Sequence, residues 1–218
     1  MEANLFLKFV KVIKTEAGSL IVRHLQLVFI SVTIAILIAV PSGILLTRPR
    51  FKSWSSKTMT FFNVAQGLPS LAVVAIFLPI MGIGFLPSII ALTVYALLPI
   101  LRNTIAGINS INPDIIESAR GMGMPSQKVL FSIEIPLALP VIIAGIQTSA
   151  VVTVGTAVIA DLIGGGGLGR LIFTGISMFD PVKILAGSIL AAIIAIAIDQ
   201  GFDLVHKKVL TPYKGVRK

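Results

Sequence analysis

The residues that could carry out chemistry are few and lie far apart in the sequence. Histidine occurs only at His24 and His206, and neither belongs to a metal-ligand or catalytic-triad pattern. Cysteine is absent, which excludes disulfides, thiolate metal sites and cysteine nucleophiles. No catalytic constellation is indicated, including a site of two histidines and one carboxylate, so we do not expect an enzyme.

A glycine-rich run, Gly164 to Gly169, superficially resembles the loops that bind nucleotide phosphates. It follows an apolar block instead of a β-strand. Arg170 and Leu171 stand where a phosphate loop needs lysine and a hydroxyl residue to hold phosphate and magnesium. We interpret the run as a flexible external turn that packs close to a partner protein.

Three aspartates lie within or beside apolar blocks: Asp161, Asp199 and Asp203. Acidic side chains inside a membrane are costly, so proton coupling is one interpretation. All three lie near the ends of their blocks, and Lys207 and Lys208 follow Asp203. Pairing at the membrane interface is the interpretation we favour.

The composition indicates a chain that lies in lipid. Of the 218 residues, 56% are hydrophobic and 12% are charged, whereas an ordinary soluble domain has roughly 25% charged residues. The net charge of +9 comes from residues between the apolar blocks. Because no basic helix carries the clustering that binding to phosphates needs, we expect no nucleic-acid partner.

Five apolar blocks are long enough to cross a hydrocarbon core of about 30 Å, which takes roughly 20 helical residues. The sequence therefore predicts a multi-pass, all-α membrane protein whose transmembrane domain covers residues 25–205. Residues 1–24 mix lysines with apolar residues, which predicts an amphipathic, interfacial helix or, as an alternative, a loosely ordered tail. Residues 206–218 form a basic tail. An alternative, disfavoured by three lysines, is that residues 5–20 enter the membrane. The five predicted spans are Leu25–Leu46, Thr58–Ile80, Phe85–Ile108, Leu137–Ile163 and Ile184–Val205.

The distribution of basic residues predicts the orientation. The loop after the first span and the C-terminal tail are rich in lysine and arginine, so the positive-inside rule puts them in the cytoplasm together with the polar segment between spans three and four. An odd number of spans then puts the N-terminus outside. Four basic residues in the N-terminal segment argue against this orientation: Lys8, Lys11, Lys14 and Arg23.

The polar segment, about residues 112–134, predicts two short helices at an angle. Asn112 suits the N-cap of the first helix, and Pro113 suits its first position. Glycines at 121 and 123 and a proline at 125 predict its end. We expect Ser126 to cap a second short helix through Ile133, and Pro136 to open the fourth span.

This segment resembles a motif of permeases in binding-protein-dependent ABC importers: Glu-Ala-Ala, three residues, Gly, nine residues, then Ile-x-Leu-Pro. The spacing matches throughout, with serine in place of one alanine and isoleucine in place of leucine. The resemblance implies a five-span type I ABC importer bundle of the MetI-like kind, with a cytoplasmic coupling helix that docks on a separate ATPase. The residues implied in ATPase coupling are Glu117, Ser118, Ala119, Gly123, Ile133 and Pro136, of which Glu117, Ala119 and Gly123 would form the docking face.

The same resemblance implies a bacterial plasma-membrane location and a set of partners. These are cytoplasmic ABC ATPase subunits, a second permease that is a copy or a paralogue, an extracellular solute-binding protein and the lipid bilayer. This chain would bind no cofactor, because ATP and magnesium would lie on the ATPase. A simple amphipathic hairpin, in which Glu117 pairs with Arg120, is the structural alternative.

The likeness is greatest to permeases for the osmoprotectants glycine betaine, carnitine and choline. It rests on the runs HLQLVFISVTIAILIAVPSGIL, NVAQGLPSLAVVAIFLPIMGIG and GGGGLG. Alternatives are a methionine or other amino-acid importer permease, or an ion-coupled secondary carrier, which would more typically have paired halves and mid-membrane charges. Polar side chains within the spans could line a solute pathway or bond between helices: Asn63, Gln66, Tyr95, Gln147, Thr148 and Thr153.

Overall fold

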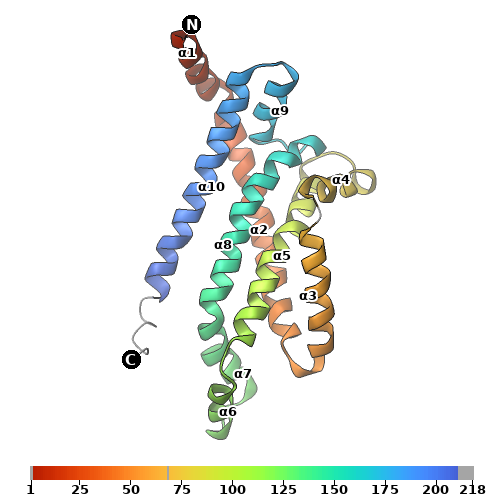
Figure 1. The fold of residues 1–218 in the computed structure, drawn as a ribbon, viewed down its shortest axis with the longest axis vertical. Helices are drawn as coiled ribbons and strands as arrows, with labels where there is room; N and C mark the ends of the chain where they lie inside the picture. The colour runs from red at the N-terminus through yellow and green to blue at the C-terminus, as the bar shows by residue number, and fades with distance from the viewer. Residues whose placement is uncertain (1, 68, 211–218) are drawn as a thin grey trace. The chain divides into compact units, whose positions relative to one another are not determined.

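The computed structural model describes residues 2–67 and 69–210, and the regular elements of that part are all helical (Figure 1). The side chains of Asn63 and Gln66 and the tail beyond residue 210 lie outside the described part. Within it, four helical stretches are long and apolar enough to cross a membrane: Leu7–Leu46, Phe85–Asn109, Ser126–Ile163 and Pro181–Lys207. The prediction of an all-α membrane protein is confirmed.

The first long stretch begins well before the predicted first span. Helix α1 (Glu2–Val12) continues through a π-helical turn, η1 (Ile13–Ala17), into α2 (Gly18–Leu46). The helix therefore passes residue 24 without a break. That residues 1–24 lie at the membrane surface stays a prediction.

The predicted second span is not one helix. After the 3₁₀ turn η2 (Pro49–Phe51), the chain forms α3 (Lys52–Gln66) and then a separate helix α4 (Ser70–Met81). Pro69 precedes α4 with an extended ψ of 132°, and it has no N–H to continue a helical hydrogen-bond ladder. The expectation of a continuous span over Thr58–Ile80 is wrong, and the count of five spans is not confirmed.

The other spans agree with the sequence except at their ends. Helix α5 (Phe85–Asn109) is followed by α6 (Pro113–Gly121) and α7 (Ser126–Val129). The π-helical turn η3 (Leu130–Glu134), α8 (Ile135–Ile159) and the 3₁₀ turn η4 (Ala160–Ile163) then form the next long stretch. The last helices are α9 (Gly169–Ser177) and α10 (Pro181–Leu210).

The chain forms two compact units, and four of its long helices contribute to both. The first unit comprises Met1–Ala35, Leu68–Ala96 and Ala150–Gln200. Its larger apolar cluster joins the start of the chain to α9 and α10 through buried Ala17, Leu171 and Ala186. A smaller cluster joins α4, α5 and η4.

The second unit comprises Ile36–Gly67, Leu97–Ser149 and Gly201–Lys218. Its core contains Ile108, Ala138 and Ile142, with Val40 and Ile44 packed against them, so it joins the end of α2 to α5 and α8. Figure 1 shows α6 and α7, in green, as a hairpin beyond the ends of α5 and α8 in this unit. We call residues 112–134 the α6–α7 hairpin.

Candidate functional site

The first helix of the α6–α7 hairpin begins as the sequence predicts. The Asn112 side chain accepts a hydrogen bond from the Asp114 backbone N–H at 3.0 Å, and Pro113 occupies the first turn. This cap satisfies one of the backbone donors that a helix start leaves free. The start of α6 is therefore determined locally.

The turn between the two helices depends on Gly123, whose φ is +79°. In this conformation the Gly123 N–H donates to the Arg120 carbonyl at 2.9 Å, and the Met124 N–H donates to the Ala119 carbonyl at 3.2 Å. Residues with a Cβ avoid positive φ, so glycine is the residue that this turn favours. The predicted break in this region is confirmed.

The second half of the hairpin differs from the prediction. The residue before α7 is Pro125, which provides no side-chain hydrogen bond, and Ser126 is the first helical residue rather than the cap. The helix does not stop at Ile133 but continues through η3 into α8, so Pro136 lies inside a long helix. In η3 the Ile135 N–H bonds to the Leu130 carbonyl, five residues back. This wider turn accommodates a proline that an ordinary helix interior excludes.

An apolar hollow of about 340 Å³ lies between the two arms of the hairpin. Three of the motif residues lie on it, and the complete lining is Asp114, Ile115, Ser118, Ala119, Met122 and Ile133. Ala119 is only 1% exposed, so it offers a partner little surface of its own. Its small side chain instead lets the arms approach each other.

The outer surface of the hairpin combines polar and apolar side chains. Glu117 and Gly123 are exposed, as are the large side chains of Met122 (75%) and Phe131 (68%). Within the described part of the chain, Glu117 makes no ion pair with Arg120. Exposed large apolar side chains of this kind are typical of surfaces that bind another protein. Pro136 lies in α8, outside the hairpin itself.

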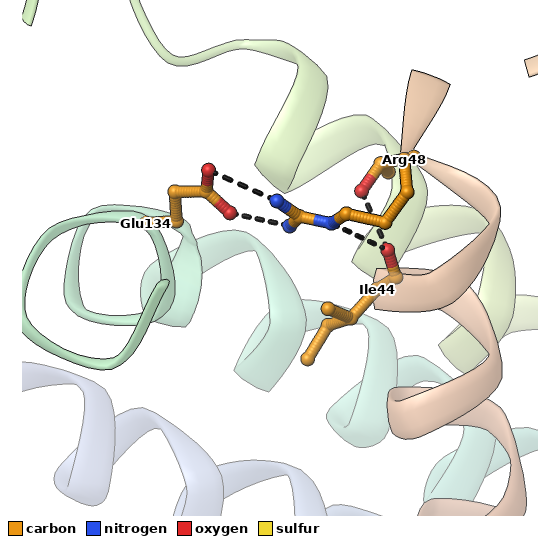
Figure 2. A network of polar contacts seen from close by, with 4 residues as sticks. Ile44, Arg48 and Glu134 are labelled. Atoms are coloured by element: carbon orange, nitrogen blue, oxygen red, sulfur yellow. Dashed lines mark hydrogen bonds and ion pairs between the residues drawn. The ribbon is translucent and has the colours of Figure 1, made fainter. Parts of the chain in front are cut away.

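A partly buried ion pair lies at the base of the hairpin, and the sequence analysis does not predict it. Figure 2 shows the Arg48 guanidinium facing the Glu134 carboxylate, with both terminal nitrogens directed at the two carboxylate oxygens. The Nη1–Oε1 distance is 3.1 Å, and Nη2 also donates to Oε2. Glu134 is the variable residue of the Ile-x-Leu-Pro motif. An acidic residue between two isoleucines is the sequence feature that could have indicated a buried ion pair here.

The predicted pathway residues do not form one described cluster. Gln147 donates to the Asp203 carboxylate at 3.1 Å, and the Thr148 hydroxyl donates to the Ala144 carbonyl at 2.9 Å, both in the second unit. Tyr95 and Thr153 belong to the first unit, where Thr153 is buried. The side chains of Asn63 and Gln66 lie outside the described part. Whether these residues line a pathway stays a prediction.

The glycine-rich run packs against other parts of this chain, and its role as a flexible external turn beside a partner protein stays a prediction. A Cβ at Gly167 would lie 3.1 Å from His24, which is fully buried. The neighbouring Arg23 donates to the Gly165 carbonyl at 3.3 Å, and its guanidinium carbon lies 3.6 Å from the centre of the Phe85 ring. The run is therefore packed against α2 and α5 of this chain. Within the described residues, no cluster of histidine and acidic side chains is suited to a metal ion.

Comparisons with known proteins identify the family to which the chain belongs. Residues 25–210 match the family described as binding-protein-dependent transport system inner membrane component. The chain is 42% identical over 208 residues to the glycine betaine/carnitine/choline transport system permease protein OpuCB of Bacillus subtilis, covering 94% of each chain. It is 45% identical to the osmoprotectant import permease protein OsmY of Salmonella typhimurium over 81% of this chain and 75% of that protein.

A solved structure of the MetNI methionine ABC transporter in an inward-facing conformation has the same fold. The TM-score is 0.79 at 22% identity, over 87% of this chain and 94% of the other. Together with the family match, this likeness confirms the MetI-like architecture expected from the loop motif. The chain belongs to the family of binding-protein-dependent transport system inner membrane components.

Proposed function

We propose that this chain forms the membrane pathway for a quaternary-ammonium osmoprotectant such as glycine betaine, carnitine or choline. As a family member it is an inner-membrane permease subunit of an ABC importer, and its role is transport rather than catalysis. The observation that supports the substrate class is the 42% identity, along nearly the whole chain, to a permease named for these three solutes.

The α6–α7 hairpin is the proposed docking element for a cytoplasmic ATPase subunit, which would hold ATP and magnesium. Its motif spacing, the exposed Glu117 and the exposed Met122 support this assignment. Ser118, Ala119 and Ile133 line the apolar hollow, and in this proposal they pack beneath the residues that contact the ATPase. In this arrangement the second permease subunit completes the pathway, and an extracellular binding protein delivers the solute.

Methionine transport is the alternative that the structural likeness suggests. That likeness is at 22% identity and concerns the fold alone. The substrate class is tested by uptake into proteoliposomes that contain the permease, its ATPase and its binding protein. We expect excess betaine, carnitine or choline to compete with one another, and excess methionine not to compete. Competition by methionine alone would contradict the proposed substrate class.

The docking assignment is tested by replacing Glu117 with glutamine and measuring co-purification with the ATPase. Gln127 is an exposed polar residue on the other arm of the hairpin, so Gln127→Ala is a matched control. We expect Glu117→Gln to weaken co-purification and ATP-driven uptake together, and Gln127→Ala to affect them less. Wild-type assembly and uptake with Glu117→Gln would remove Glu117 from the docking face.

A further inference from the structure

The Arg48 side chain makes contacts both to the C-terminal end of α2 and to the base of the hairpin. Its Nε donates to the Ile44 carbonyl at 3.3 Å, and the Thr47 hydroxyl donates to the same carbonyl at 2.7 Å. The carbonyls of a last helical turn have no helical partner four residues on and carry partial negative charge, which favours a cation there. Figure 2 shows this bond between Arg48 and the Ile44 carbonyl, which anchors Arg48 to the end of α2.

Glu134 is the last residue of η3, the π-helical turn that connects the α6–α7 hairpin to α8. The residue is only 6% exposed, and its carboxylate accepts from both terminal nitrogens of Arg48. A buried carboxylate needs such a partner, because it has lost its water. The guanidinium fork satisfies both oxygens and also fixes their orientation.

The pair joins two segments that lie far apart in the sequence, since residues 48 and 134 are separated by 86 positions. One segment is the end of the first membrane helix, and the other is the base of the hairpin. A wide π turn weakens the regular helical ladder at this base, so the hairpin could otherwise pivot relative to α8. A bidentate contact to α2 opposes that pivot.

We propose that the Arg48–Glu134 pair is a positioning contact that makes the α6–α7 hairpin and the end of α2 move together. The inference rests on the proposed docking of the hairpin to an ATPase. With the pair intact, a displacement of the hairpin shifts α2. Without the pair, the hairpin still docks and the ATPase still turns over, but less of the motion reaches the membrane helices.

The test compares Arg48→Lys and Glu134→Gln with wild type in proteoliposomes that contain the ATPase and the binding protein. Lysine keeps the charge but loses the fork, and glutamine keeps the shape but loses the charge. Arg50→Gln is the control, because Arg50 is an exposed arginine in the same turn. ATPase co-purification, ATP hydrolysis and solute uptake are measured for each variant.

We expect both variants to co-purify with the ATPase and to hydrolyse ATP, while solute moved per ATP falls about tenfold, within the usual range of coupling between sites. Arg50→Gln should keep the wild-type ratio. An unchanged ratio in both variants would overturn the proposal. If wild type itself neither bound the ATPase nor used ATP for uptake, the proposed function would fail instead.

A second measurement does not depend on activity. Because the sequence has no cysteine, Gln127→Cys gives a single spin-label site on the exposed arm of the hairpin. The spectrum of the label should indicate greater mobility in the Arg48→Lys and Glu134→Gln backgrounds than in the Arg50→Gln background. Equal mobility in all backgrounds would contradict the positioning role, even if a variant assembled poorly.

Discussion

Gly145 of α8 lies directly against Asn103 of α5. A Cβ on Gly145 would be 2.5 Å from the Asn103 Cβ and 3.0 Å from the Pro99 carbonyl oxygen. The two helix backbones therefore approach as closely as small residues allow, which is typical of helix contacts in membranes. The contact holds α5 and α8 together within the second compact unit.

Gly145→Ala is the first prediction. The added methyl group meets backbone as well as side chain, so the helices must separate, and the free energy of unfolding should fall by about 1–3 kcal/mol, as in overpacked cores. Gly155→Ala is the matched control in the same helix, because nothing lies within 4 Å of its Cβ position. Thermal unfolding in detergent measures both. Equal midpoints for the two variants would contradict the close crossing.

Gly123→Ala should disturb the hairpin through backbone conformation alone. The φ of Gly123 is +79° and nothing lies within 4 Å of its Cβ position, so the cost is that of placing an L-residue in the left-handed region, roughly 1–2 kcal/mol. Asparagine tolerates this region better, so Gly123→Asn should be milder. The effect of each variant on the hairpin is measured by its co-purification with the ATPase. Gly121→Ala is the control, because Gly121 has open space and no positive φ. If Gly123→Ala and Gly123→Asn lost ATPase co-purification to the same extent, the cause would be direct contact between Gly123 and the ATPase, not backbone conformation.

Asn112→Ala should loosen the first turn of α6. It removes the acceptor for the Asp114 N–H, a cap that contributes about 1 kcal/mol in comparable helices. Amides early in α6 should then exchange hydrogen about fivefold faster, since one kcal/mol corresponds to that factor. Asn112→Asp keeps an acceptor and serves as control. Unchanged exchange in Asn112→Ala would mean that the cap does not hold α6.

The features that the sequence predicts well are those with a local cause. The Asn112 cap lies two residues from the group that it satisfies, and the turn at Gly123 follows from one backbone angle. The long apolar helices follow from length and composition, although the Gly67–Pro69 interruption of the second span was overlooked. Pro136 misled the prediction because a π turn, which leaves no clear sequence signal, lets the helix continue through it.

The features that the sequence did not predict depend on partners far along the chain. Arg48 belongs to the basic loop that predicts membrane orientation, Glu134 stands at the variable position of the loop motif, and nothing local in the sequence joins them. The same holds for the glycine run, whose packing depends on His24, more than a hundred residues earlier. Composition alone gives no sign of this close approach, which a glycine permits because it lacks a Cβ.

The bond between Gln147 and Asp203 distinguishes two roles for Gln147. The amide donates to the carboxylate at 3.1 Å, joining α8 to α10. If joining the helices is its main role, the double variant of Gln147→Ala and Asp203→Ala should lose less stability than the sum of the two single losses. Hydrogen bonds between membrane helices contribute on average about 0.6 kcal/mol, so the coupling energy in thermal unfolding should be of that size.

Transport kinetics complete this last test. A Gln147 that only joins helices should leave the KM for solute uptake unchanged when it is replaced by alanine, because the solute never touches it. A Gln147 that lines the pathway should raise the KM in Gln147→Ala, and Asp203→Ala should not reproduce that rise. The double-mutant cycle measures the energy of the Gln147–Asp203 bond, and the KM depends on contact with the solute. The two measurements therefore separate the roles even if both variants lose some stability.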